Sequence, residues 1–170
     1  MGTVRHQLTL FVDKDDANHI ESIRAKFNPI QHNLISCHVT LCREDEITNL
    51  EKVLENLRSL KWQPITIQFD QVIRFENGKG VLLPGAINNN EFHQLRQKVL
   101  QGLVNPVRQH LPHITLMHPR NSTCTDEIFE IIRKVNLPVS LRFKTISLIG
   151  QIDGGQWQTR LTIPGTNSLA

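Results

Sequence analysis

The sequence contains two related stretches, Ser36-Cys37-His38-Val39-Thr40-Leu41-Cys42 and Pro112-His113-Ile114-Thr115-Leu116-Met117. Both include His-apolar-Thr-Leu within a run of apolar and β-branched residues, which favours a β-strand. Alternate side chains of a strand share a face, so each copy should present one imidazole and one hydroxyl together. The residues on that shared face are His38 and Thr40 in the first copy and His113 and Thr115 in the second.

The rest of the chain predicts the same order of elements around each copy. Hydrophobic periodicity favours helices at 15–27, 48–60, 89–103 and 125–135, with a capping box of Thr48 and Glu51 at the start of the second. Alternating or continuous apolar runs favour strands at 7–13, 34–43, 65–75, 81–83, 113–118, 139–152 and 157–163. Each half of the chain therefore reads strand, helix, His-x-Thr strand, helix and further strand.

This order predicts an α+β fold, with helices covering antiparallel sheets in two pseudo-symmetric lobes. The turns at Asn77-Gly78 and Gly154-Gly155 favour hairpins, whose strands are antiparallel. A doubly wound parallel sheet is the disfavoured alternative. We expect residues 1–170 to form a single domain in which each lobe supplies one His-x-Thr motif.

Composition narrows the class of protein. Apolar residues make up 39% of the chain and charged residues 21%, as expected of a packed globular fold. The net charge of +3 is compatible with an anionic ligand, but acidic and basic residues are interspersed, so no extended nucleic-acid stripe is predicted. Three cysteines without a CxxC pair favour a reduced, cytoplasmic protein without disulfides or a cysteine zinc site. No apolar run is long enough to span a membrane, and no obligate protein partner is evident.

At these two stretches the chain resembles the two-histidine (2H) phosphoesterase superfamily, which includes the RNA 2′,3′-cyclic phosphodiesterases also called 2′-5′ RNA ligases. The resemblance rests on His38-Val39-Thr40-Leu41, on His113-Ile114-Thr115-Leu116 and on Arg120 nearby. It implies a bilobal fold with two antiparallel sheets flanked by helices around a central cleft. The continuation of the first copy, Cys42-Arg43-Glu44-Asp45-Glu46, lacks the Phe-Leu-Gly of the better-known RNA ligases, which leaves the exact substrate open.

The resemblance implies a phosphodiesterase that needs neither metal nor cofactor and acts on the 2′,3′-cyclic phosphate of nucleotides or RNA ends, or on 2′-5′ linkages. One histidine would be the general base and the other the general acid, because imidazole titrates near neutral pH. The two threonines would donate hydrogen bonds to the non-bridging phosphate oxygens. Which histidine is the acid stays open. The alternative is a module on the same fold that binds a nucleotide or RNA phosphate without turnover.

Other polar and aromatic residues can serve either the site or an ordinary structural role. Arg43 and Arg120 can bind phosphate or stack on a base, although strict alternation places both on the strand face opposite the two histidines. The same alternation places Cys42 beside His38 and predicts His118 to be a surface residue. The remaining histidines, expected to be exposed, are His6, His19, His32, His93 and His110. The aromatic residues Phe11, Phe75 and Trp157 can stack a base, but core packing is their commoner role.

Overall fold

The computed structural model describes residues 2–166 and has an α+β architecture with two antiparallel sheets. The helices are α1 (Asn18–Phe27), α2 (Pro29–Leu34), α3 (Leu50–Ser59), α4 (Asn90–Val99) and α5 (Asp126–Arg133), together with the short 3₁₀ helix η1 (Glu44–Glu46). The strands are β1 (Val4–Phe11), β2 (His38–Cys42), β3 (Ile65–Gln68), β4 (Ile73–Arg74), β5 (Val81–Pro84), β6 (His113–Met117), β7 (Ser140–Phe143), β8 (Thr145–Ile152) and β9 (Gln158–Pro164). The predicted fold class is confirmed.

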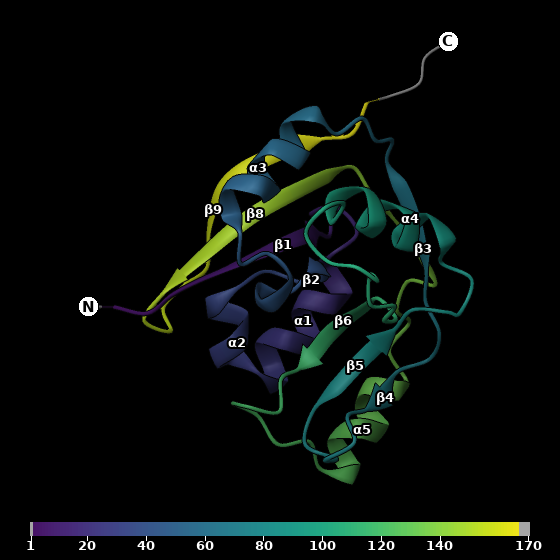
Figure 1. The fold of residues 1–170 in the computed structure, drawn as a ribbon. Coiled ribbons are helices and arrows are strands. Elements are labelled where there is room, and N and C mark those ends of the chain that lie inside the picture. The colour runs from purple at the N-terminus through teal and green to yellow at the C-terminus, as the bar shows by residue number, and fades with distance from the viewer. Residues whose placement is uncertain (1, 167–170) are drawn as a thin grey trace.

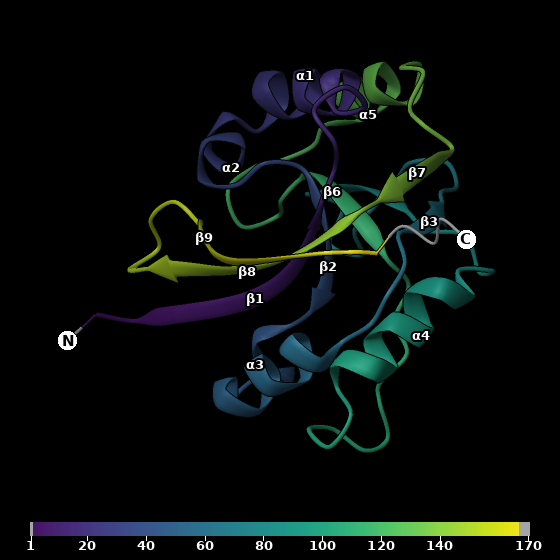
Figure 2. The same cartoon turned by 90° about the horizontal axis from the view of Figure 1, so that it is seen from above.

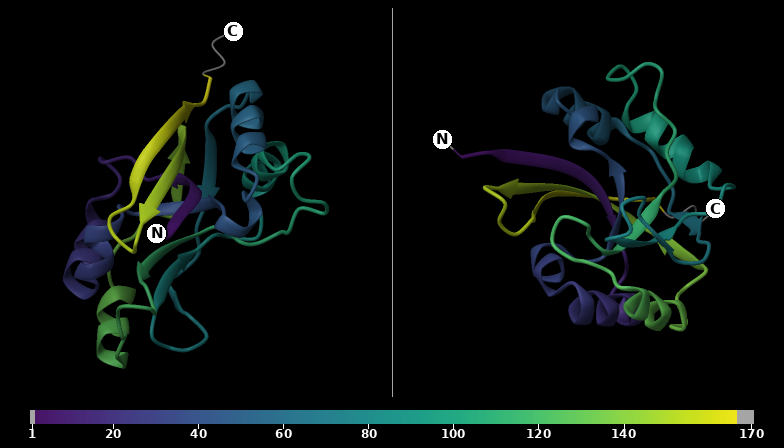
Figure 3. Two further views of the ribbon diagram at one scale, coloured as in Figure 1. Left: turned by 60° about the vertical axis from the view of Figure 1, so that its left-hand side comes forward. Right: turned by 90° about the horizontal axis from the view of Figure 1, so that it is seen from below.

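The larger sheet joins both halves of the chain. It has seven strands in the order β4-β5-β6-β2-β1-β8-β9, and β3 and β7 pair separately (Figure 1). Every pairing among the described strands is antiparallel, which excludes the doubly wound alternative. In Figure 2 the strands lie between two groups of helices, with α1, α2 and α5 on one side and α3 and α4 on the other, and Figure 3 shows the same division from below.

The two His-x-Thr strands are neighbours at the middle of this sheet. Strands β2 and β6 pair antiparallel with Val39 opposite Ile114, and both of these side chains are fully buried. Their burial anchors the strands to the core from behind. Because the register is antiparallel, continuing it by one residue in each direction sets His38 beside Thr115 and Thr40 beside His113.

Each motif strand contains a β-bulge directly after its threonine. On the first, Thr9 pairs with Thr40 while the preceding Leu8 pairs with Cys42, so Leu41 is skipped. On the second, Leu82 pairs with Thr115 and Val81 with Met117, which skips Leu116. The burial pattern is the same in both strands, with two consecutive buried residues after the threonine. A bulge of this kind shifts the alternation by one residue, so the side chains that follow change face.

Several predicted elements differ in detail. The run 65–75 is not one strand but two, β3 and β4, which belong to different sheets. The segment after Asn28 forms the unpredicted helix α2, since Pro29 is compatible with the first turn of a helix. Asn49, not Thr48, caps α3, because its side chain accepts a hydrogen bond from the amide of Lys52.

The core runs along both motif strands. Fully buried Leu8 and Leu10 of β1 and Phe92 of α4 belong to the same cluster as Val39 and Ile114. Within residues 2–166 no helix combines the length and apolar character needed to cross a bilayer.

Candidate active site

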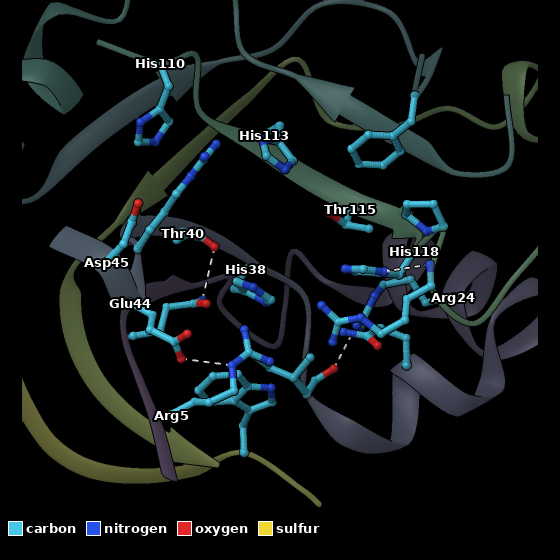
Figure 4. Close-up of a pocket in the computed structure, with 18 residues that line it drawn as sticks. Arg5, Arg24, His38, Thr40, Glu44, Asp45, His110, His113, Thr115 and His118 are labelled. Carbon is cyan, nitrogen blue, oxygen red and sulfur yellow. Dashed lines mark hydrogen bonds and ion pairs between the residues drawn. The ribbon is translucent and has the colours of Figure 1, made fainter. Parts of the chain in front are cut away.

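Both motifs open into one cavity of about 520 Å³ (Figure 4). Its walls come from β1, β2 and β6, from α1 and α2, from the loops before and after the motif strands, and from Trp157 in the loop between β8 and β9. Pockets of this size hold small ligands such as nucleotides. The predicted site residues that line it are His38, Thr40, Arg43, His113, Thr115 and Arg120. The structure therefore brings all six together.

His38 is held in one tautomer. Its Nδ1 lies 2.8 Å from the carbonyl oxygen of Ser36, and a carbonyl can only accept, so Nδ1 carries the hydrogen and Nε2 has a free lone pair. The ring also meets Phe11 edge to face at 6.0 Å between centroids. Burial lowers the pKa of His38 to about 4, opposed by the Ser36 hydrogen bond and reinforced by the charge of Arg24. The free protein therefore holds His38 neutral at pH 7.

His113 has a matching environment. Phe75, after β4, meets its ring edge to face at 6.1 Å. Burial lowers the pKa of His113, a hydrogen bond with the backbone of Leu111 opposes this shift, and the charge of Arg43 adds to it. Each imidazole is thus held by an edge-to-face contact with a phenylalanine and by a hydrogen bond to the backbone of the residue two positions before it.

Gln7 is a site residue that the sequence analysis missed. Its Nε2 donates to Thr9 Oγ1 at 2.8 Å and to Thr40 Oγ1 at 3.0 Å. Because the Thr40 oxygen accepts this bond, its own hydrogen is free to donate into the cavity. Gln7 lies two residues before Thr9 on the same face of β1, and only the pairing of β1 with β2 places it beside Thr40.

The bulges explain why Arg43 and His118 line the cavity. Strict alternation placed Arg43 and Arg120 on the opposite face and made His118 a surface residue, and all three placements were wrong. With Leu41 and Leu116 skipped, the pocket face continues at Arg43 in one half and at His118 in the other, two residues before Arg120. For the same reason Cys42 does not share the face of His38 and is fully buried. The two consecutive apolar residues after each threonine were the sequence signal for this shift.

The cavity is electropositive. Arg5 is neutralised by Glu44 at 2.9 Å, and Arg24 forms an ion pair with Glu21 at 2.5 Å. The guanidinium groups of Arg43 and Arg120 form no ion pair with any residue between 2 and 166, and they are the free cations of the lining. Such groups suit a phosphate.

Two further histidines belong to this cavity. His110 and His118 both line it, so His110 is not the exposed residue that the sequence suggested. Burial lowers the pKa of His110 to about 4, and burial together with the charge of Arg120 lowers that of His118. Of the five histidines expected at the surface, only His19 is exposed, whereas His6, His32, His93 and His110 are half-buried. Among the described residues, no group of three His, Cys, Asp or Glu side chains is placed to hold a metal ion.

The structure thus places one His-x-Thr strand from each half of the chain side by side at the middle of one antiparallel sheet. The sequence model of the 2′-5′ RNA ligase superfamily matches residues 12–155, and the chain belongs to that superfamily. No curated protein matches the chain.

Solved structures of the same fold extend over nearly the whole chain. E. coli LigT in its apo form superposes with a TM-score of 0.70 at 17% identity, covering 97% of this chain and 99% of LigT. LigT complexed with 3′-AMP gives 0.66 at 15% identity, with 98% and 100% covered. The protein TT0787 of Thermus thermophilus gives 0.58 at 13% identity, with 96% and 100% covered. At these identities the likeness shows the fold.

Proposed function

We propose that this protein is a phosphodiesterase that hydrolyses the 2′,3′-cyclic phosphate of nucleotides or RNA ends, or cleaves 2′-5′ linkages, by two-histidine acid–base catalysis without a metal. The observation that carries the proposal is the arrangement of His38 and His113 on adjacent strands, each with a threonine of the other strand beside it in one cavity. LigT, which shares the fold, has been crystallised with 3′-AMP, a nucleoside monophosphate.

The chemistry follows from these positions. One imidazole removes a proton from water, whose oxygen forms a bond to phosphorus. The bond from phosphorus to one ribose oxygen breaks, and the other imidazole gives that oxygen a proton. The product is a nucleoside monophosphate with a free neighbouring hydroxyl. Thr40 and Thr115 donate to the non-bridging oxygens as negative charge develops there, and Arg43 and Arg120 hold the phosphate. The bound phosphate's negative charge raises the lowered pKa of the acid histidine and so favours its protonation.

The test is hydrolysis of adenosine 2′,3′-cyclic phosphate in EDTA by the wild type, His38→Ala and His113→Ala. Each substitution should lower kcat by about 10²–10⁴-fold, because each removes one proton-transfer group. His19→Ala is the matched control, since His19 is exposed on α1 and outside the cavity, and it should keep full activity.

Circular dichroism checks that each variant is folded. Substantial turnover by either motif variant would contradict the proposed mechanism. Saturable binding of the nucleotide by the wild type without any product would instead support the binding module.

The three cysteines are free and buried, and we place the protein in the cytoplasm, where thiols stay reduced.

A further inference from the structure

A second cavity adjoins the candidate active site. It has a volume of about 640 Å³ and shares two of its lining residues, Ile35 and Trp157, with the first. Trp157 is fixed at this boundary because its amide donates to the carbonyl of Leu34 at 2.9 Å. Figure 2 shows the loop between β8 and β9, which carries Trp157, beside α2. Both cavities have the size of small-ligand pockets, so the pair can hold a ligand of two units.

Two aromatic residues, Phe11 and Trp157, line this second cavity. The Arg5 guanidinium lies over one face of the Trp157 ring, 5.4 Å from its centroid, and Arg5 lines the first cavity only. The opposite face of the ring is therefore left for the second cavity. Phe11, which touches His38 edge to face, lines the second cavity as well. Half-buried aromatic faces of this kind are the surfaces on which nucleobases stack.

The polar lining suits a nucleotide. The side chains of Asn18, Ser36 and Thr159 make no hydrogen bond to any other described residue and are free to bind a base edge or a ribose hydroxyl. Lys14 is exposed and has no ion pair within residues 2–166. The one acidic group in the lining, Glu21, is neutralised by Arg24 and accepts from the amide of Cys37. Lys14 is therefore the one charged group of this lining that has no ion-pair partner among the described residues.

We infer that the second cavity binds the nucleotide that precedes the terminal one, so that the preferred substrate is an oligonucleotide end and not a mononucleotide. This inference rests on the proposed function. With the terminal cyclic phosphate between His38 and His113, the chain continues from the terminal ribose past Ile35 and Trp157. The preceding base then stacks on Trp157 or Phe11, and Lys14 faces the connecting phosphate.

The experiment compares kcat/KM for adenosine 2′,3′-cyclic phosphate with that for the dinucleotide ApA carrying a terminal 2′,3′-cyclic phosphate. Stacking one base on an aromatic side chain should favour the dinucleotide by at least roughly fivefold. Lys14→Gln should reduce this ratio about threefold, and Lys14→Glu further, because an exposed ionic contact is weak and salt-dependent. Lys134→Gln is the matched control, since Lys134 is exposed at the end of α5 and lines neither cavity.

Equal kcat/KM for the two substrates, or a ratio that Lys14→Glu leaves unchanged, would overturn the second site while the proposed function stands. Failure of the wild type to hydrolyse either substrate would overturn the proposed function, and the second site with it.

Discussion

The hydroxyl of Thr40 owes its direction to Gln7. The amide of Gln7 occupies one lone pair of Thr40 Oγ1, so the hydroxyl hydrogen is left to donate into the cavity. Donors aimed in advance at developing charge are the strongest contributors to this type of catalysis. Gln7 acts through Thr40 and is therefore a positioning residue.

A double-mutant cycle tests this role. We expect Thr40→Val to lower kcat about 10²-fold, as for the loss of one donor to a transition-state oxyanion. Gln7→Met should lower it only about fivefold, the equivalent of one hydrogen bond of about 1 kcal/mol. In the Thr40→Val background Gln7→Met should have no further effect, because the group it positions is gone. Independent, additive losses in kcat would exclude the positioning role.

Arg43 provides a second prediction at this scale. Its guanidinium forms no ion pair with any described residue, and it reaches the cavity only because of the bulge at Leu41. Arg43→Ala should lower kcat/KM for the cyclic nucleotide by about 10- to 100-fold, the equivalent of one charged hydrogen bond of about 1.5–3 kcal/mol. Arg43→Lys should recover part of this loss by keeping the charge.

Steady-state kinetics measures both changes, and Arg58→Ala is the control because Arg58 is an exposed residue of α3. If Arg43→Ala has the same kcat/KM as the control, Arg43 does not bind the phosphate.

Strand β2 keeps its bulge through a buried arginine of helix α4. Skipping Leu41 takes its carbonyl out of the regular ladder, and Arg96 Nη1 donates to that carbonyl at 2.6 Å. The same guanidinium pairs with both oxygens of Glu46 in η1, at 3.0 and 2.7 Å, and donates to the carbonyl of Arg108 at 2.8 Å. Arg96 is 1% exposed and Glu46 is 5% exposed. One side chain thus ties α4, β2, η1 and the loop before β6 together.

Removal of Arg96 should therefore be costly. Arg96→Ala removes both short guanidinium bonds of the buried Glu46 carboxylate and leaves it only the Arg43 amide at 2.9 Å and the Arg108 guanidinium at 3.6 Å. We expect a loss of about 3–5 kcal/mol in the free energy of unfolding. Urea unfolding followed by circular dichroism measures it. Arg58→Ala, which removes an exposed arginine of α3, should cost less than about 0.5 kcal/mol, the effect of an ordinary surface substitution. A similar loss in the two variants would show that the buried pair contributes little.

Across the whole molecule, burial of histidines couples stability to pH. Burial lowers the pKa of each of five imidazoles below the ordinary value: those of His38, His93, His110, His113 and His118. Between these lowered values and about 6.5 the unfolded chain binds more protons than the folded one. The free energy of unfolding therefore rises with pH across this window. The contribution of these histidines is complete above about pH 6.5 and is lost as the pH falls toward about 4.

Thermal unfolding at a series of pH values tests this coupling. We expect Tm at pH 5 to lie roughly 5 °C or more below Tm at pH 7.5, since a loss of 1 kcal/mol lowers Tm by about 2–4 °C in a chain of this size. His110→Gln should reduce the difference, because it removes a group whose pKa burial lowers to about 4. Unchanged Tm between the two pH values would show that these imidazoles titrate alike in the folded and unfolded chain.

The sequence by itself determined the two motifs, their strands and the fold class. These are local properties: the His-x-Thr spacing sets a shared face, β-branched neighbours favour a strand, and the hairpin turns require antiparallel partners. Both motif strands agree with this prediction from histidine to threonine.

Only the tertiary structure decided what surrounds the motifs. The bulges at Leu41 and Leu116 depend on the registers with β1 and β5, and they bring Arg43 and His118 to the cavity against the local alternation. Gln7 reaches the site through the order of the strands and His110 through the packing of a loop. No short-range sequence pattern predicts either of these arrangements. The physical reason is that periodicity describes one strand alone, whereas the face a residue occupies after a bulge is fixed by the neighbouring strand that pairs with it.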